Sequence, residues 1–119
     1  MALQKVGLGT VTRVALGSTA TVLTVGSAKT CYIRSIICHN IDTVNSSTVK
    51  IHIVPVSGVS AGTASSDNQL AQLSIQPTDT YFFELAYPIT LASTDDTIQV
   101  YNSSTTDAIN VLILGDKEA

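Results

Sequence analysis

The segment Thr-Val-Lys-Ile-His-Ile-Val-Pro-Val at residues 48–56 alternates apolar and polar side chains over most of its length. Successive side chains of a β-strand point to opposite faces, so the apolar residues gather on one side of an extended chain. This inward set comprises Val49, Ile51 and Ile53. The alternation predicts a strand with one buried and one solvated face.

The preceding segment, residues 30–41, carries apolar side chains at both odd and even positions. Such a segment is expected to form a central strand with both faces covered. A polar turn over residues 42–47 separates it from the strand at 48–56. We expect these two strands to form a hairpin.

The rest of the chain is rich in β-branched residues and keeps helical spacing nowhere for long, so strands are the default element. Short strands are expected at residues 20–25, 70–75, 80–85, 89–91, 97–101 and 108–114, separated by turn-forming residues. This spacing predicts an all-β sandwich or barrel in which the last strand is internal. The expected core includes Val49, Ile51, Ile53, Ile98, Val100, Val111 and Ile113.

Two segments stand apart from this pattern. Residues 1–16 are irregularly apolar and are interrupted by Gly7 and Gly9, which predicts an N-terminal arm or edge strand. Residues 17–119 are then expected to form a single β-sandwich domain. Within it, the Ser-, Gly- and Ala-rich segment 57–68 predicts a long projecting loop.

Composition narrows the range of functions. The chain has 119 residues, which suits one domain, and its 45% hydrophobic content excludes intrinsic disorder. Charged residues make up only 13%, whereas Ser and Thr together number 29. The net charge of −3 argues against nucleic acid as a partner, because binding phosphates needs clustered cations. No apolar stretch reaches the roughly 20 residues of a membrane span, and no secretory signal is recognised, so we expect a cytosolic product without a membrane partner.

The two cysteines, Cys31 and Cys38, lie seven positions apart. Their odd spacing is expected to place them on opposite faces of one strand, more than about 20 Å apart, which is too far for a disulfide. We therefore expect two buried, reduced thiols. The spacing does not match a Cys-x-x-Cys redox or zinc site.

Histidines and aspartates are the candidate metal ligands. Matching the two strands in register places His39 on the core face and His52 on the opposite face, so we expect no two-histidine site. The aspartates in predicted turns are Asp67, Asp79, Asp95, Asp96 and Asp107. They lack EF-hand spacing and are expected to bond their own backbone, with convergence on a cation as the alternative.

One catalytic pattern occurs in the chain. Gly58-Val59-Ser60-Ala61-Gly62 matches the Gly-x-Ser-x-Gly nucleophile elbow of α/β-hydrolases. The elbow must open a helix, and its histidine must follow the serine, whereas both histidines precede Ser60. We therefore expect no enzyme activity, no catalytic residue, no cofactor and no metal.

Four segments resemble small structural proteins of tailed bacteriophages. They read Cys-Tyr-Ile-Arg-Ser-Ile-Ile-Cys-His-Asn at 31–40, Pro-Thr-Asp-Thr-Tyr at 77–81, Leu-Ala-Ser-Thr-Asp-Asp-Thr-Ile-Gln-Val at 91–100 and Asn-Val-Leu-Ile-Leu-Gly at 110–115. Where those proteins usually have Gly before Asp, this chain has Thr78 and Asp95. The resemblance implies an antiparallel β-sandwich that is jelly-roll-like, belongs to a virion and lacks catalysis.

On this resemblance we expect a capsid decoration or cement protein, assembled into the virion in the host cytoplasm. It would form a homotrimer and stabilise the shell by bridging neighbouring major capsid proteins. The N-terminal arm would reach a neighbour through Leu3, Val6, Leu8 and Val11 and add a strand to an exposed sheet edge.

Two alternatives remain open. A tail fibre, baseplate or head–tail connector component would use the projecting loop at 57–68 equally well. A carbohydrate-binding β-sandwich module would need aromatic stacking platforms. The candidates for such platforms are Tyr32, Tyr81, Tyr87 and Tyr101.

Overall fold

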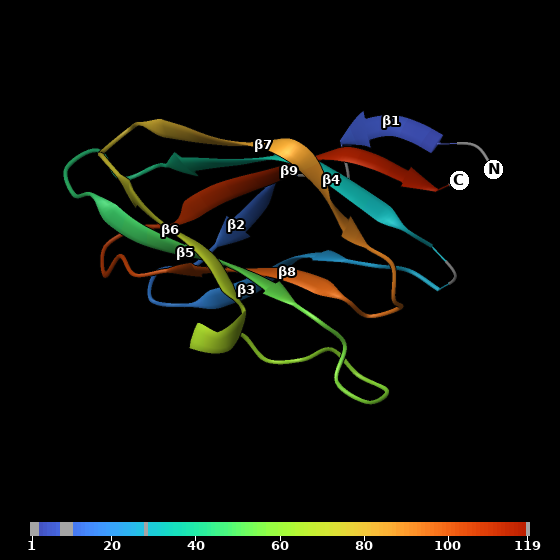
Figure 1. The fold of residues 1–119 in the computed structure, drawn as a ribbon. Coiled ribbons are helices and arrows are strands. Elements are labelled where there is room, and N and C mark those ends of the chain that lie inside the picture. Colours follow the sequence, from blue (N-terminus) through green and yellow to red (C-terminus); the bar gives the residue numbers. More distant parts are fainter. Residues whose placement is uncertain (1–2, 8–10, 28, 119) are drawn as a thin grey trace.

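The computed structural model describes residues 3–7, 11–27 and 29–118. Their strands are β1 (Leu3–Gly7), β2 (Thr12–Val14), β3 (Thr19–Thr24), β4 (Cys31–Asn40), β5 (Ser47–Val54), β6 (Gln69–Ile75), β7 (Thr80–Leu91), β8 (Thr97–Asn102) and β9 (Ile109–Glu118). A single 3-10 turn, η1 (Ser66–Asn68), precedes β6. Two antiparallel sheets stack face to face, so the predicted all-β sandwich is confirmed (Figure 1).

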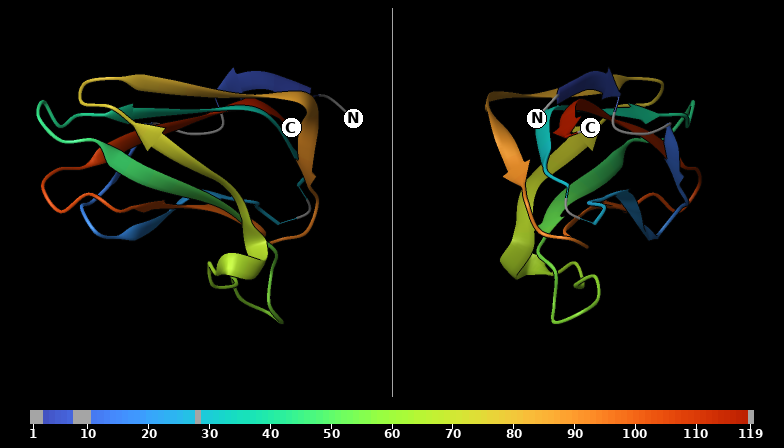
Figure 2. Two further views of the ribbon diagram at one scale, coloured as in Figure 1. Left: turned by 60° about the vertical axis from the view of Figure 1, so that its left-hand side comes forward. Right: turned by 90° about the vertical axis from the view of Figure 1, so that its right-hand side faces the viewer.

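The strand pairs of the two sheets are nested along the sequence. Sheet A has the order β1-β9-β4-β7, with β2 also paired to β9, and sheet B has the order β3-β8-β5-β6. The pairs therefore nest as β2 with β9, β3 with β8, β4 with β7, and β5 with β6. Figure 2 shows the resulting layers from two further sides. The last strand, β9, is internal, as predicted.

The expected hairpin between β4 and β5 is wrong. β4 lies in sheet A and β5 in sheet B, so the turn over residues 41–46 carries the chain from one layer to the other. Stacking these two strands face to face buries the apolar side of each against the other sheet. The two strands expected at 80–85 and 89–91 are also joined in the single strand β7.

A β-bulge at Arg34 reverses the alternation of β4. The register moves from Ile33 opposite Gly115 to Ser35 opposite Leu114, so β4 has one residue more than β9 at this point. Odd-numbered residues face the core before the bulge, and even-numbered residues face it afterwards.

This bulge corrects the expected placement of the cysteines. Cys31 precedes the bulge and Cys38 follows it, so both side chains are buried in the core despite their odd spacing. Both are free thiols. Burial raises the pKa of the Cys38 thiol to about 12 and also raises the pKa of Cys31, which keeps both protonated at neutral pH.

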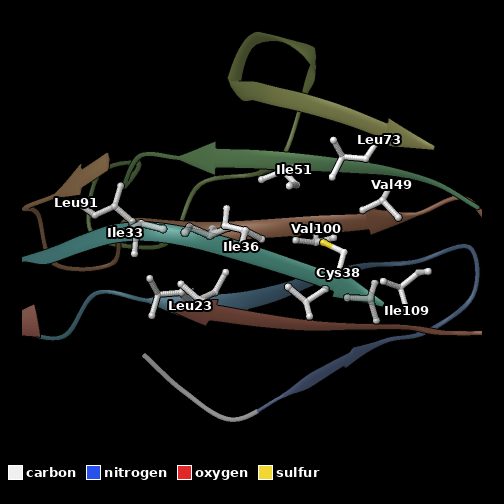
Figure 3. Close-up of a cluster of buried hydrophobic side chains, with 14 of the residues drawn as sticks. Leu23, Ile33, Ile36, Cys38, Val49, Ile51, Leu73, Leu91, Val100 and Ile109 are labelled. Atoms are coloured by element: carbon white, nitrogen blue, oxygen red, sulfur yellow. The ribbon is translucent and has the colours of Figure 1, made fainter. Parts of the chain in front are cut away.

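Apolar side chains from both sheets fill the space between the layers (Figure 3). The largest fully buried side chains include Ile33, Ile36, Ile51, Ile75, Ile98 and Ile109. Of the seven predicted core residues, six are buried, which confirms the inward set of β5, β8 and β9. Ile53 is the exception, because it is only partly buried at the margin of the cluster.

Two buried asparagines tie the sheets together at one end. Asn40 ends β4 in sheet A and donates from Nδ2 to the carbonyl oxygen of Ile75 in sheet B at 3.1 Å. Asn102 ends β8 in sheet B and donates to the carbonyl oxygen of Val14 in sheet A at 3.2 Å. Each amide thus satisfies a backbone acceptor of the opposite layer.

Candidate functional site

The outer face of sheet A carries an apolar row across neighbouring strands. Leu112 of β9 pairs with Ile37 of β4, and Ile37 pairs with Phe82 of β7, so the three side chains share one face. Val11, directly before β2, lines the same hollow as Leu112 and Ile37. We call these four residues the apolar row. Phe82 is 60% exposed and Val11 is 57% exposed.

His39 lies on this outer face, and its expected place on the core face is wrong. It is half-buried and in register with Asn110 of β9 and Thr80 of β7. Its Nδ1 is 2.9 Å from Oγ1 of Thr80. The bulge at Arg34 is the cause, because it turns the odd-numbered residues of the second half of β4 outward. His39 therefore helps to line the hollow of about 220 Å³ beside the apolar row.

Charged side chains flank the apolar row without interrupting it. Glu84 lies two positions along β7 from Phe82, and Arg13 lies two positions along the chain from Val11. Beyond Glu84, at the bulge, the Arg34 guanidinium pairs with the buried Asp116 carboxylate at 2.8 Å. A molecule lying on the row would thus meet an uncharged strip between separated charges of opposite sign.

The four predicted interface residues have different positions. Leu3 and Val6 belong to β1, whose backbone pairs with β9 of the same chain, opposite Glu118 and Gly115. Leu8 lies outside the described residues. Val11 is exposed and belongs to the apolar row. A role of these residues in contacting a partner stays a prediction.

The outer face of sheet B carries polar side chains in a comparable row. Lys50 of β5 pairs with Gln72 of β6 and with Tyr101 of β8, and Tyr101 pairs with Thr19 of β3. We call these four residues the polar row. The Lys50 ammonium lies 5.8 Å from the centroid of the Tyr101 ring, within the range of a cation–π contact.

The loop over residues 57–68 folds back on this face. His52 points outward, as predicted, but it is buried, because its Nδ1 lies 3.0 Å both from the Ser65 carbonyl oxygen and from Oδ1 of Asn68. Gln99 is also held under the loop, donating from Nε2 to the Gly62 carbonyl oxygen at 3.1 Å. Between loop and sheet lies a hollow of about 250 Å³. Its lining includes Thr19, Lys50, His52, Ser66, Gln69 and Tyr101.

The Gly-x-Ser-x-Gly motif at 58–62 forms a turn and no nucleophile elbow. The backbones of Ser57 and Ser60 bridge each other, and Gly58 has a φ of +64° at the tip. Val59 beside it is 97% exposed. An elbow leads directly into a helix. The residues that follow Ser60 are irregular as far as the short η1 turn.

Three of the five turn aspartates bond the backbone as expected. Asp79, Asp96 and Asp107 each accept a hydrogen bond from a backbone N–H in or beside their own turn. The side chains of Asp67 and Asp95 make no such bond within the described residues, so the expectation is wrong for these two. Within residues 3–7, 11–27 and 29–118, no group of three or more His, Cys, Asp or Glu side chains is placed to hold a metal ion. In the same part of the chain, no helix has the length and apolar character needed to cross a membrane.

The four tyrosines do not form a common platform. Tyr32 lies on β4, Tyr81 and Tyr87 lie on β7, and Tyr101 lies on β8 in the other sheet. Only Tyr101 lines the hollow on sheet B. Sequence reasoning therefore missed two features of the structure, the apolar row on sheet A and the hollow on sheet B, because each depends on cross-strand register.

Comparison of the sequence with models of protein families found no match, and a search of curated proteins found no significant one.

Proposed function

We propose that this protein is a capsid decoration or cement protein, which stabilises a virion shell by bridging neighbouring major capsid proteins. The observation that carries the proposal is the apolar row of Val11, Leu112, Ile37 and Phe82 on the outer face of sheet A. Contiguous exposed apolar surface marks a site of protein contact. That the partner belongs to a virion shell is inferred from the four sequence segments that resemble small structural proteins of tailed bacteriophages.

A shell subunit is the occupant that we assign to the apolar row. The row extends across a sheet face and is bordered by one acid, Glu84, and one base, Arg13. An apolar centre with a polar rim is the usual organisation of a protein–protein interface. One small contact contributes little affinity, but many symmetric copies on a shell add avidity.

Sheet A also offers an edge for self-association. β7 is its outermost strand and, in the part of the chain that the structure describes, pairs only with β4. An unpaired strand edge accepts a further strand, and we propose that a second copy supplies it within a homotrimer. The pairing of β1 with β9 could be exchanged between copies in such a trimer. The nested strand pairs support a jelly-roll description of the domain.

The first test locates the chain in the particle. Virions purified on a density gradient are analysed by quantitative mass spectrometry and by electron cryo-microscopy. We expect many copies, in fixed ratio to the major capsid protein, distributed over the shell. A few copies at one vertex would instead support a tail fibre, baseplate or connector component. Absence of the chain from the particles would refute every virion role.

The second test compares the two faces. Phe82→Ser removes the most exposed member of the apolar row, and Leu70→Ser removes a 44% exposed leucine from β6 in sheet B. Both variants should fold, because neither side chain is in the core. Binding to particles stripped of the protein should fall at least about tenfold for Phe82→Ser and stay unchanged for Leu70→Ser. Equal binding by both variants would exclude the apolar row as the contact.

A further inference from the structure

The hollow on sheet B, beside the loop over residues 57–68, has the composition of a small binding site. Its side chains come from every strand of the sheet, with Thr19 on β3, Tyr101 on β8, Lys50 on β5 and Gln69 on β6. The loop segment that leads into η1 forms one wall of the hollow through Ala64, Ser65 and Ser66. We propose that this hollow binds a sugar acid, meaning a single saccharide ring that carries a carboxylate. The proposal is independent of the proposed role in the capsid.

The hydrogen bonds of His52, which lines the hollow, define the roles of its two ring nitrogens. Both neighbours of its Nδ1 are acceptors, the Ser65 carbonyl oxygen and Oδ1 of Asn68, so Nδ1 carries the proton. The Asn68 amide is oriented by two further bonds, since its Oδ1 accepts from the Ser65 N–H at 2.9 Å and its Nδ2 donates to the Thr63 carbonyl oxygen at 3.0 Å. With the proton of the neutral tautomer assigned to Nδ1, the lone pair of Nε2 is the acceptor of that tautomer.

The other ring nitrogen, Nε2, is open to solvent. His52 lines the hollow, and its Nδ1 is engaged by Ser65 and Asn68 of the loop segment. Across the described chain, no buried side-chain nitrogen or oxygen lacks a hydrogen-bond partner. Nε2 of His52 has no hydrogen-bond partner in that part of the chain, so this nitrogen must be accessible to solvent. A ligand hydroxyl could donate to it.

Lys50 supplies the charge. Its ammonium is held near the Tyr101 ring, and no Asp or Glu lines the hollow to neutralise it. A ligand carboxylate would pair with the Lys50 ammonium through a charge-assisted hydrogen bond. The hydroxyls of Thr19 and Ser66 and the Gln69 amide offer both donors and acceptors.

These groups together select a sugar acid. A sulfate dianion brings no hydrogen-bond donor and hydrogen phosphate brings one, whereas a sugar ring brings several hydroxyls to the polar lining of the hollow. A neutral sugar would leave the Lys50 charge without a partner. The volume of about 250 Å³ is below the range of drug-sized pockets, which suits one ring.

The test uses the full chain, labelled with ¹⁵N and titrated in NMR spectra. The probes are glucuronate and N-acetylneuraminate, with glucose and inorganic phosphate for comparison. We expect saturable shifts of the amide signals of residues 50, 52, 65, 66 and 101 with at least one sugar acid. Glucose should bind at least about tenfold more weakly, and phosphate should not compete. The two sugar acids distinguish a uronic acid from a sialic acid ligand.

Two matched lysine variants test which positive charge binds the sugar acid. Lys50→Gln should weaken sugar-acid binding at least about tenfold while the remaining spectrum shows the native fold. Lys117→Gln, an exposed lysine on β9, should leave binding unchanged. Absence of saturable shifts with both sugar acids would overturn the proposal. Equal competition by phosphate, or full binding by Lys50→Gln, would also overturn it. Phe82→Ser should bind the sugar acid normally, which separates this result from the capsid test.

Discussion

The two outer faces of the sandwich have the same construction and opposite chemistry. Sheet A presents Val11, Leu112, Ile37 and Phe82, and sheet B presents Gln72, Lys50, Tyr101 and Thr19. The inward positions of both sheets contribute apolar side chains to one core, so the contrast lies on the outward positions. Core packing does not dictate the chemistry of outward-facing residues.

The two faces also differ in whether a loop packs on them. The apolar row of sheet A includes two well-exposed side chains, Val11 and Phe82, whereas the loop over residues 57–68 holds the buried His52 and Gln99 on sheet B through hydrogen bonds. Hydrogen bonds from the loop hold those side chains in one arrangement before any ligand arrives. Such pre-organisation suits a small ligand, while the open row suits a large partner.

The largest effect is expected from a substitution in the core on which both sheets pack. Ile51 is fully buried between the sheets, so Ile51→Ala should lower the free energy of unfolding by about 2–5 kcal/mol, through lost burial and a residual cavity. Urea denaturation measures it. Val59→Ala, at a 97% exposed loop tip, should change stability by less than about 0.5 kcal/mol. Similar losses in both variants would contradict the assigned register of β5.

The next largest effect concerns the hydrogen bond by which Asn102 of sheet B holds β2, the strand next to Val11. Asn102→Ala removes the donor to the Val14 carbonyl oxygen and should cost about 1–3 kcal/mol, because buried backbone acceptors lose their partner. Hydrogen exchange should show faster opening of β2 than of β5. Asn110→Ala, on the half-buried outer face, is the matched control and should be nearly neutral. An unchanged free energy of unfolding in Asn102→Ala would mean that the Asn102 hydrogen bonds contribute nothing to stability.

Acid should weaken the same end of the sandwich. The hydroxyl of Thr106, then the backbone N–H groups of Val44 and Asn45, bond the Asp42 carboxylate and lower its pKa from 3.8 to about 2. Since the folded-state pKa is the lower one, ionised Asp42 stabilises the fold above about pH 4. This contribution is lost as the pH falls from about 4 to about 2.

Asp42→Asn tests this by comparison with the native chain. The stability difference between the two should be largest at neutral pH and shrink over that acid range, as followed by urea denaturation at each pH. Thr106→Val should raise the pKa of Asp42 toward its usual value in a ¹³C NMR titration. An unchanged titration curve would contradict the role of the Thr106 hydroxyl.

The smallest effect compares the turns that lead into β7 of sheet A and β8 of sheet B. Thr78 and Asp95 both have a left-handed backbone, with φ of 59° and 70°, at the positions where the phage proteins usually have Gly. A β-branched residue tolerates this conformation less well than Asp. Thr78→Gly should therefore raise the free energy of unfolding by about 0.5–1 kcal/mol, and Asp95→Gly by less. Thermal denaturation of both variants measures the order, and the reverse order would contradict the explanation.

Much of the fold was predictable because the signals are local. The alternation over residues 48–56 identified β5 and its inward face, and the turn chemistry around Asp79 and Asp96 separated the following strands correctly. The functional features were harder to predict. The apolar row joins Ile37 to Leu112, and neither residue carries a sign of the other in its local sequence.

The sequence by itself determined an all-β fold, its main strands and most of its core, because side-chain alternation and turn-forming residues act over a few neighbouring positions. The tertiary structure decided which strands share a sheet, and it turned His39 outward through the bulge at Arg34. It also decided that a loop covers His52. These outcomes depend on hydrogen bonds and packing between distant segments, where a shift of one residue exchanges the buried face for the exposed one.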